Sequence, residues 1–543
     1  MRWWGWGEDA GAIGLPDAAG AMLRSEPGLN RSERGERVAL EQVTLPQPSL
    51  GPAVQRQLAA AVGEDGVRND HLSRVSHAAG KSYPDLVRLR AGDASTAPDA
   101  VVAPSSAEQI AAVLAVCASA GVAVVPFGGG TSVVGGVDAL RGAHPSAISL
   151  DLSKLDRVIA LDHRSLTASL EAGIFGPELE RRLAAEGLTL GHFPQSFEFS
   201  TVGGWVATRS AGQASTGYGR IDELVEAVEM QTPSGPLSTR HVPATAAGPS
   251  LRELIVGSEG VLGVITSATL AVRPLPESRH YEAWSFKTFA EGAEAMRAME
   301  QAGASPDVAR LSDEEETRLS KALGSSGSFT EKAGNRYLDL RGHGEACLAF
   351  TGFEGQPDDV ARRRGRAAEL LRAAGGLSLG ERPGRSWLRG RFAAPYLRDD
   401  LLDRGVMVET LETAGSWSNL AGLYAAVRRT LVDTLSARGT PPLVTCHVSH
   451  LYQSGASLYF TYLARQELGA ELDQWRAAKH AAGDAILANG GTITHHHAVG
   501  RDHAPWMEAE VGALGLDVLR AVKDRVDPSG IMNPGKLLPG GPS

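Results

Sequence analysis

The chain has 543 residues, too many for one hydrophobic core, and its length predicts roughly three to four domain-sized units. Its 53 basic and 63 acidic side chains give a net charge of −10, which argues against a general nucleic-acid or anionic-membrane binder. The three cysteines, Cys117, Cys347 and Cys446, form no CxxC pair, so neither a cysteine metal site nor a disulfide framework is predicted. The sequence contains no apolar run of about 18 residues that would predict a membrane-spanning helix, and no signal peptide is expected.

Residues 1 to about 45 are rich in glycine, proline and charged residues and are predicted to form an arm. Its main apolar groups are Trp3, Trp4 and Trp6. These side chains either dock the arm onto the body of the protein, which we favour, or anchor it on a lipid surface. Peripheral membrane contact is therefore kept as the alternative.

The first regular elements follow the arm. Apolar residues four apart predict helical structure from about 50 to 90. Residues 97–104 are predicted to form a strand bounded by prolines. Ser105 and Glu108 fit a capping box and predict the start of a helix that ends at Gly121.

A glycine-rich loop comes directly after a short apolar run. Residues 122–125 predict a buried strand, and residues 126–136 contain five glycines. Without Cβ atoms, successive N–H groups can form a cradle for an anion such as a diphosphate. The Rossmann spacing fails at Val133, and the Walker A spacing fails because Gly136 follows Gly135. The loop is either a phosphate site of another kind or an ordinary turn.

The rest of the first half is predicted to complete one domain. Residues 148–152 and 166–172 alternate between apolar and polar side chains and predict two half-buried strands. Residues 177–186 predict a helix, and residues 261–272 a further strand pair. Two prolines close the unit, which is placed at about 91–276.

A different pattern begins after this domain. Two predicted strands, 281–286 and 347–353, are each followed by a predicted helix, at 289–301 and 358–374. Such repeated strand–helix units indicate a ferredoxin-like α+β domain.

The predicted elements continue towards the C-terminus. Ser418 is expected to cap a helix that ends at Gly439. Strands are predicted at 443–450 and 457–463, and another helix at 473–489.

Three adjacent histidines, His495, His496 and His497, follow a Gly-Gly turn inside the chain. Neutral histidine near pH 7 is suited to proton transfer. Neighbouring side chains on a strand point to opposite faces, so at most two of these rings should converge, and zinc ligands are usually spaced further apart. We therefore predict a catalytic site without a metal, with a structural role for individual histidines as the alternative.

Tyr459 and Arg398 are two further candidates. Tyr459 shares the more polar face of its predicted strand with Thr461, although core packing is the usual role of a strand tyrosine. Arg398, in the segment Tyr-Leu-Arg-Asp, is either an exposed helix charge or a bidentate clamp on a phosphate or carboxylate.

Together these segments resemble the alkylglycerone-phosphate synthase (alkyl-dihydroxyacetonephosphate synthase) branch of the vanillyl-alcohol-oxidase-type FAD family. The resemblance covers nearly the whole chain and includes residues 4–7, 191–205, 396–399, 457–460 and 490–500. It implies an α+β fold with a two-subdomain FAD-binding domain and a ferredoxin-like α+β cap domain. The predicted division is an N-terminal arm and helical region at 1–90, the FAD-binding domain at 91–276, the cap at 277–500, and a C-terminal segment that returns to the flavin at 501–543.

The resemblance also implies a redox-neutral reaction. The acyl group of acyl-dihydroxyacetone phosphate is exchanged for a long-chain fatty alcohol, a step of ether lipid synthesis, and FAD does not carry electrons away. Tyr459 is then the acid/base, the three histidines assist, and Arg398 holds the phosphate. The expected FAD contacts are Pro126, Phe127, Gly128, Gly129, Gly130, Thr131, Ser132, Gln195, Ser196, Phe197, Glu198, Phe199, Ser200, Thr201, Thr208, Arg209, Ser210, Ala211, Glu259, Gly260, Val261, Leu262, Gly263, Val264 and Ile265.

Several expectations accompany this reading. FAD is expected to be non-covalent, because the glycine-rich loop offers no histidine or cysteine. We expect a homodimer in a bacterial cytoplasm, since neither end carries an evident peroxisomal address. The alternative function is an FAD-dependent D-2-hydroxy-acid dehydrogenase, in which Arg398 holds a carboxylate and histidines take the hydroxyl proton. A histidine-rich metal-binding protein without flavin is the third possibility.

Overall fold

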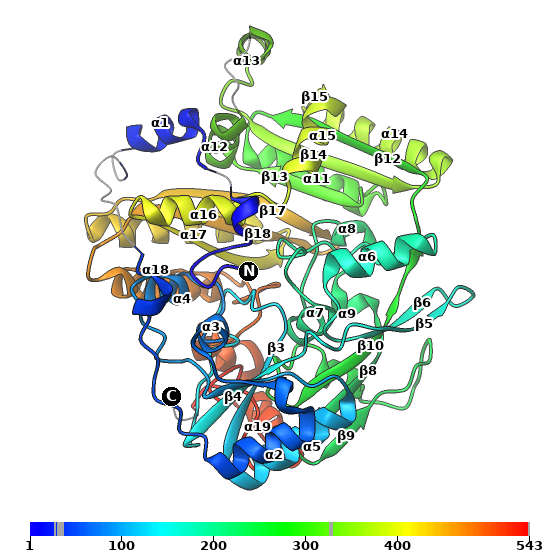
Figure 1. Cartoon of the computed structure of the whole chain (residues 1–543). Helices are drawn as coiled ribbons and strands as arrows, with labels where there is room; N and C mark the ends of the chain where they lie inside the picture. Colours follow the sequence, from blue (N-terminus) through cyan, green and yellow to red (C-terminus); the bar gives the residue numbers. More distant parts are fainter. Residues whose placement is uncertain (13, 27–28, 30–36, 325–328, 541–543) are drawn as a thin grey trace.

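The computed structural model describes residues 1–12, 14–26, 29, 37–324 and 329–540. Residues 27–28 and 30–36 of the predicted arm lie outside the described residues. The chain forms two halves, a lower one built on two sheets and an upper one built on a single large sheet (Figure 1). The mixture of helices and sheets confirms the predicted α+β class.

The first sheet of the lower half carries the glycine-rich loop. Its order is β1-β2-β4-β3, with β2, β4 and β3 parallel. The elements are α2 (Pro52–Val62), β1 (Val67–Arg68), β2 (Ala100–Val102), α5 (Ala107–Ala120), β3 (Val122–Phe127) and β4 (Ser146–Asp151). Strand β4 is buried along its whole length, so the prediction of a half-buried strand here was wrong. Parallel strands are covered on both faces, and the polar side chains of β4 are buried with the apolar ones.

The second sheet is antiparallel, in the order β5-β6-β10-β8-β9. Its strands are β5 (Val158–Asp162), β6 (Thr167–Glu171), β8 (Val225–Thr232), β9 (Gly235–Ser238) and β10 (Val264–Ala271). The predicted strand pair at 261–272 is one strand, β10, because its partners β6 and β8 come from elsewhere in the chain.

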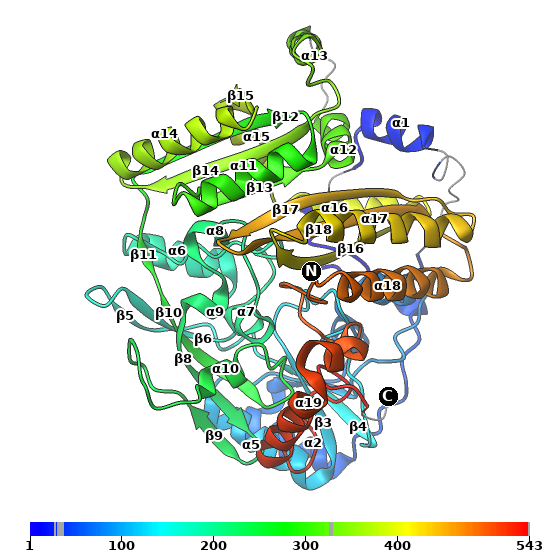
Figure 2. The same cartoon turned by 180° about the vertical axis from the view of Figure 1, so that it is seen from behind.

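The upper half begins with a ferredoxin-like unit. Its elements are β12 (Ser278–Phe286), α11 (Phe289–Gln301), β13 (Val308–Ser312), β14 (Cys347–Gly355), α14 (Pro357–Ala373) and β15 (Leu377–Gly380). The strand order β15-β12-β14-β13 is that of a βαββαβ fold with two helices on the sheet (Figure 2). The predicted cap architecture is therefore confirmed.

A second, similar unit extends the same sheet through the pairing of β13 with β17. Its elements are β16 (Val406–Ser416), α17 (Leu420–Ala437), β17 (Leu443–Tyr452), β18 (Gly455–Arg465) and α18 (Glu471–Ala488). Helix α18 is followed by the irregular segment 489–500 where a fourth strand is expected. Thr492 N–H donates to Ala414 O of β16, so this segment, which contains the three histidines, lies against the edge of the sheet.

Two helix starts differ from the predictions. The side chain of Ser106, not Ser105, accepts a hydrogen bond at the start of α5. Helix α17 begins after Asn419 without a side-chain cap, so the Ser418 cap was wrong. The predicted helical region at 50–90 is also interrupted, since Gly63, at φ +86°, ends α2 and later helices start anew at α3 (His71–Ser76) and α4 (Tyr83–Arg90).

The N-terminal arm is docked, as favoured from the sequence. Trp6 is buried, and Trp3 packs against the cluster that contains Val75 and Leu89. The guanidinium of Arg90, on α4, lies 5.6 Å from the ring centroid of Trp4. These contacts place the tryptophans on the protein body.

The C-terminal segment returns to the first sheet. After α19 (Met507–Val526), Met532 pairs with Val124 of β3, and Asn533 donates to Gly136 O of the glycine-rich loop (Figure 2). None of the described helices combines the length and the apolar character needed to cross a bilayer. The predicted domain limits remain a prediction.

Candidate active site

The glycine-rich loop begins at the end of β3 and packs against the segment 194–212. Gly130 and Gly135 adopt φ of +66°, a conformation that favours glycine. A Cβ on Gly129 would overlap the carbonyl oxygen of Phe199, and one on Gly128 would overlap the Thr201 hydroxyl. The loop therefore needs its glycines for close packing as well as for turning. This packing brings together two predicted FAD segments, the glycine-rich loop and the segment 194–212.

The second predicted FAD segment leads into α7 (Val202–Thr208). Thr201 caps this helix by accepting from Gly204 N–H, and Arg209 follows it in the left-handed conformation, at φ +50°. Phe197 lies in a hydrophobic core, where it stacks on Trp205. Phe197 therefore has a packing role, and the predicted FAD contacts of this segment remain predictions.

Glu259, in the third predicted FAD segment, has a clear partner on the other side of the site. Its buried carboxylate accepts hydrogen bonds from Val499 N–H (2.8 Å) and Gly500 N–H (2.7 Å). Burial raises the pKa of Glu259 to about 7, and the two backbone hydrogen bonds oppose the rise. Glu259 thus holds the end of the histidine segment against the lower half of the protein.

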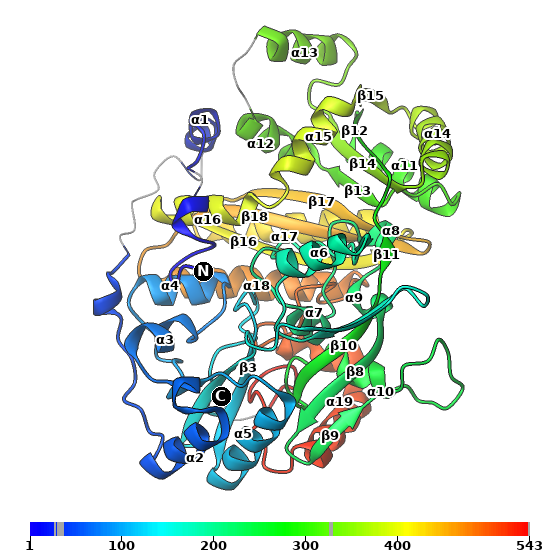
Figure 3. The ribbon, with the colours of Figure 1, turned by 45° about the vertical axis from the view of Figure 1, so that its right-hand side comes forward.

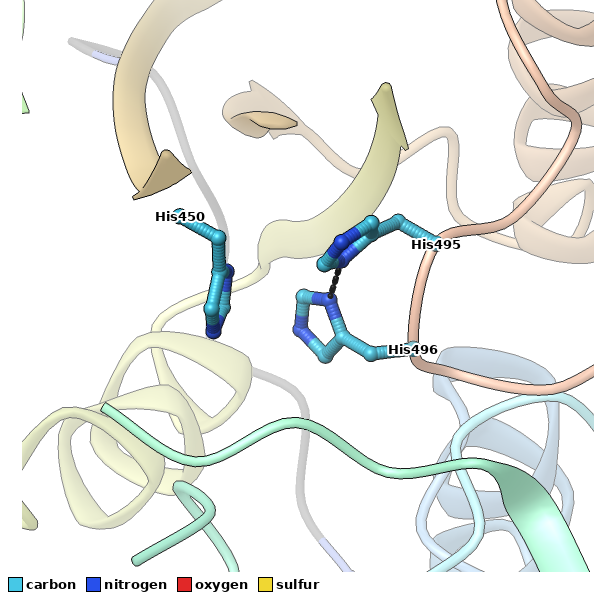
Figure 4. A group of neighbouring side chains, drawn as sticks. All are labelled: His450, His495 and His496. Carbon is cyan, nitrogen blue, oxygen red and sulfur yellow. Dashed lines mark hydrogen bonds between the residues drawn. The ribbon is translucent and has the colours of Figure 1, made fainter. Parts of the chain in front are cut away.

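The three histidines do not lie on a strand, so the argument that at most two rings converge does not apply. His495 and His496 face His450 of β17 (Figure 4), and one nitrogen of each lies within 4.8 Å of the others. His495 Nδ1 and His496 Nδ1 are 2.9 Å apart, which requires a proton on one of them. His495 Nε2 lies 2.6 Å from the Tyr452 hydroxyl, and His450 Nε2 lies 3.0 Å from Gly212 O.

This histidine cluster (His450, His495, His496) has the spacing of a metal site. The hydrogen bonds described above already engage both nitrogens of His495 and the Nε2 atom of His450. Burial lowers the pKa of His450 and of His496 to about 3, so both rings are neutral near pH 7. The prediction of a site without metal remains a prediction.

Glu412 of β16, which the sequence analysis did not single out, anchors the histidine segment. Its side chain is 1% exposed. Its carboxylate accepts from the backbone N–H of His495, His496 (3.1 Å) and His497 (2.7 Å), and from the Thr494 hydroxyl (2.7 Å). Burial alone would raise the pKa of Glu412, but the histidines and the Thr494 bond lower it well below the usual range. A charged, fully buried glutamate therefore fixes three consecutive histidines.

Tyr459 lies beside this anchor. In the sheet it pairs with Glu412 on one side and with His447 on the other. Its ring stacks on that of His447, with centroids 4.9 Å apart, and meets His497 edge to face at 5.4 Å. The face predicted from the alternation is confirmed, because Leu458, Phe460 and Tyr462 point into the core while Tyr459 does not.

The environment of Tyr459 keeps its hydroxyl protonated. Burial raises the pKa of Tyr459 to about 12. A hydrogen bond with Thr410 lowers the pKa, the charges of Glu412 and Glu409 raise it further, and the positive charge of Arg398 lowers it least of these. The phenol is therefore protonated near neutral pH, and Arg398 is the cation that acts on it.

Arg398 lies on α16 (Ala394–Asp403), and its guanidinium points inwards rather than into solvent. Nη1 donates to Lys81 O at 2.8 Å. Nε and Nη2 are buried and have no hydrogen-bond partner among the described residues. Buried donors are nearly always paired, so two free N–H groups on a cation indicate a site for an anion. The exposed-charge alternative for Arg398 is excluded.

A second buried ion cluster supports the other face of Tyr459. His447 Nδ1 and Arg310 Nη2 each lie 2.9 Å from Glu316 Oε1. Burial raises the pKa of Glu316, but the charge of Arg310 and the hydrogen bond with His447 outweigh it and bring the pKa to about 2. Arg310 and Glu316 are six residues apart in the chain, and the pairing of β13 with β17 brings His447 to them. No sequence motif pointed to Arg310 or Glu316.

A cavity of about 330 Å³ separates the histidine cluster from the FAD-binding half. Its lining combines the predicted FAD residues Thr208, Arg209 and Glu259 with Tyr452, His495 and His496. Ligand pockets have volumes of about 300–1,000 Å³, so a flavin ring system fits here in size. The residues present therefore suit FAD, with the histidines on one side of the cavity.

Comparisons with known proteins identify the family of the chain. Residues 98–239 match the family described as FAD binding domain, and residues 275–537 match FAD linked oxidases, C-terminal domain. An alkyldihydroxyacetonephosphate synthase of Dictyostelium discoideum is 34% identical over 99% of this chain and 93% of its own length. The same-named protein of Trypanosoma brucei brucei is 33% identical over 96% of this chain and 85% of its own.

The structural comparison leads to the same family. A solved alkyldihydroxyacetonephosphate synthase superposes with a TM-score of 0.85 at 31% identity, covering 98% of both chains. A probable mitochondrial D-lactate dehydrogenase of Danio rerio is less similar, at 26% identity over 90% of this chain and 92% of its own. The chain therefore belongs to the alkyldihydroxyacetonephosphate synthase family and is an FAD-dependent enzyme.

Proposed function

We propose that this enzyme exchanges the acyl group of acyl-dihydroxyacetone phosphate for a long-chain fatty alcohol. The products are alkyl-dihydroxyacetone phosphate and a free fatty acid. The observation that carries the proposal is the contact of Tyr459 with the Glu412-anchored His496 and His497, next to a cavity of flavin size that His495 and His496 line. The guanidinium of Arg398, with two donors unpaired among the described residues, adds a site for an anion. This grouping occurs in a chain whose relatives carry the corresponding name.

Arg398 is the proposed phosphate ligand. Arg398 Nε and Nη2 are buried and have no partners within the described chain, so they can donate two parallel hydrogen bonds to the oxygens of a phosphate. A bound phosphate would satisfy the donors that the protein leaves open. It would also hold the rest of the substrate in a fixed direction relative to Tyr459, whose pKa is already affected by the Arg398 charge.

Tyr459 is the proposed proton-transfer residue. The phenol is protonated at neutral pH, because burial raises its pKa to about 12. The ring of His496 is neutral, because burial lowers its pKa to about 3, and its centroid lies 5.9 Å from that of Tyr459. The pair therefore combines a protonated phenol with an uncharged imidazole. Bound FAD supplies the electron-poor ring system that activates the substrate carbon without net oxidation.

The exchange is balanced without an external electron acceptor. The bond between the substrate carbon and the acyl oxygen breaks, and the fatty acid leaves. The alcohol oxygen forms the new bond to the same carbon and loses its proton. Tyr459, assisted by His495, His496 and His497, carries this proton to the carboxylate that leaves, so the fatty acid takes up the proton that the alcohol loses.

The test is product analysis with the purified yellow protein. Acyl-dihydroxyacetone phosphate and hexadecanol should give the ether and free fatty acid under anaerobic conditions, with no acceptor dye. The dehydrogenase alternative predicts the opposite result in this assay. Bleaching of the flavin by a D-2-hydroxy acid, together with no ether product, would move the chain to that function.

Three finer points are part of the proposal. We expect a homodimer and a bacterial cytoplasmic location. We also expect no dependence on a lipid surface, because Trp3, Trp4 and Trp6 already contact the protein body. Sedimentation of the purified enzyme measures its oligomeric state. Flotation with anionic and neutral vesicles measures lipid binding.

A further inference from the structure

The N-terminal segment Arg2–Gly7, with the sequence Arg-Trp-Trp-Gly-Trp-Gly, packs against α16, the helix that carries Arg398. Trp6 N–H donates to Asp399 Oδ2 at 2.7 Å, and the Arg2 guanidinium lies 3.3 Å from the same carboxylate. A Cβ on Gly5 would overlap the carboxylate of Asp399. The contact therefore requires both the charge of Arg2 and the glycine.

The same segment also touches the FAD-binding half. The ring of Trp6 meets that of Phe199 edge to face, with centroids 5.9 Å apart. Phe199 O is the atom against which Gly129 of the glycine-rich loop packs. In Figure 3 the N-terminus lies between the cap sheet and α4. Trp6, which is 3% exposed, thus connects α16 with the predicted diphosphate loop.

Lys81 contacts the glycine-rich loop, Arg398 and the N-terminal segment. Its N–H donates to Ser132 O of the glycine-rich loop at 2.6 Å, and its carbonyl oxygen accepts from Arg398 Nη1 at 2.8 Å. Its ammonium group donates to Arg2 O at 2.7 Å. One buried residue therefore sets the distances among the loop, the arginine and the arm.

We propose that Arg2–Gly7 is a positioning element of the active site, which holds Arg398 at a fixed distance from the glycine-rich loop. The segment contacts α16 through Asp399. It contacts Phe199, whose carbonyl oxygen packs against the glycine-rich loop. Lys81 links the segment to both Arg398 and the loop. This inference rests on the proposed role of Arg398 as the phosphate ligand. It explains why a segment far from the catalytic residues in sequence carries closely spaced glycines and tryptophans.

A steric variant tests the proposal without removing any side chain of the site. Gly5→Ala places a methyl group against the Asp399 carboxylate and should lift the arm from α16. We expect the KM for acyl-dihydroxyacetone phosphate to rise about tenfold or more, because small displacements of a positioning group are costly, while FAD content stays unchanged. Gly14→Ala is the matched control, since a Cβ there meets nothing within 4 Å, and it should behave as the wild type.

A second variant covers the case in which Gly5→Ala does not fold. Arg2→Gln removes the ion pair with Asp399 and should raise the same KM about threefold, again without loss of FAD, as expected for a partly buried pair. Unchanged KM in both variants, or activity lost only in proportion to FAD, would overturn the proposal.

A binding measurement separates this inference from the proposed reaction. Dihydroxyacetone phosphate is titrated calorimetrically into the wild type, Arg398→Lys, Gly5→Ala and Gly14→Ala. Weaker binding in Arg398→Lys and Gly5→Ala, but not in Gly14→Ala, supports the positioning role even if no ether is formed. Equal binding by wild type and Gly5→Ala contradicts it, whatever the reaction.

Discussion

Glu412→Gln tests whether the anchor of the histidine segment is essential. The carboxylate accepts four hydrogen bonds, from the N–H groups of His495, His496 and His497 and from the Thr494 hydroxyl. Three of these bonds fall on Oε1 and the one from His495 N–H falls on Oε2, so glutamine with its oxygen in the Oε1 position turns its NH₂ group towards His495 N–H. At about 1.5–3 kcal/mol for a bond to a charged group and about 0.5–1.5 kcal/mol for a neutral one, losing the first bond and weakening the other three costs about 3–6 kcal/mol.

This free-energy cost should destabilise the histidine segment rather than the whole fold, because β16 keeps its pairing with β18. A cost of about 3 kcal/mol raises the population of the open segment more than a hundredfold, since about 1.4 kcal/mol is a factor of ten. Hydrogen exchange of the amides of 495–497 should speed up by that factor. Turnover should fall about a hundredfold or more, with FAD retained, because the histidines lose their fixed positions.

Glu409→Gln is the matched control. Glu409 lies on the opposite face of the same strand and is buried, but it bonds Trp475 Nε1 rather than the histidine segment. Burial raises the pKa of Glu409, so glutamine resembles its protonated form. This variant should leave exchange at 495–497 unchanged. Equal exchange and turnover in Glu412→Gln and wild type would refute the anchoring role.

The same residue predicts a pH dependence. The pKa of Glu412 is lowered in the folded protein relative to about 4.3 in an unfolded chain. Its contribution is therefore complete above about pH 4.3 and is lost as the pH falls towards the folded pKa. Protection of the 495–497 amides should decline in this acid range in the wild type, and the decline should be absent in Glu412→Gln.

Four further predictions concern the chemistry of the site. Tyr459→Phe should lose turnover by about a hundredfold or more while keeping FAD, as expected for a proton-transfer group, whereas Tyr462→Phe, which removes a buried hydroxyl without a partner in the described chain, should retain activity. Arg398→Lys should lower activity at least about tenfold, because the charge remains but the bidentate fork is lost, whereas Arg362→Lys on the exposed face of α14 should have no effect. Acid precipitation should release the yellow colour into the supernatant, and colour in the pellet would contradict non-covalent FAD. Dialysis against a chelator should leave turnover unchanged, with elemental analysis of the dialysed protein as the check on a metal at the histidine cluster.

Local sequence determined the elements whose signal lies within a few residues. Helix α11 has the predicted limits, 289–301, because an apolar stripe and a threonine cap are both local. The alternation of β18 correctly placed Tyr459 on the face away from the core. The glycine-rich loop was located by composition alone. Each of these features follows from the periodicity or the steric freedom of neighbouring residues.

The errors arose where burial depends on distant partners. The alternation of β4 indicated one exposed face, but both faces of this parallel sheet are covered by other segments. The expectation that at most two of the three adjacent rings converge agrees with the structure, in which His495 and His496 meet His450 of another element. Its premise of a strand was wrong, because the chain leaves α18 irregularly.

Tertiary structure alone decided how the candidate site is held together. Glu412 and His495 are 83 positions apart in the chain, and Arg398 and Lys81 are 317 apart, yet each pair is hydrogen bonded. No local pattern encodes such contacts, because they depend on the order of strands in the cap sheet and on the docking of the arm. The sequence supplied the chemical groups, and the cost of leaving buried charges and N–H groups unpaired selects the arrangement that brings them together.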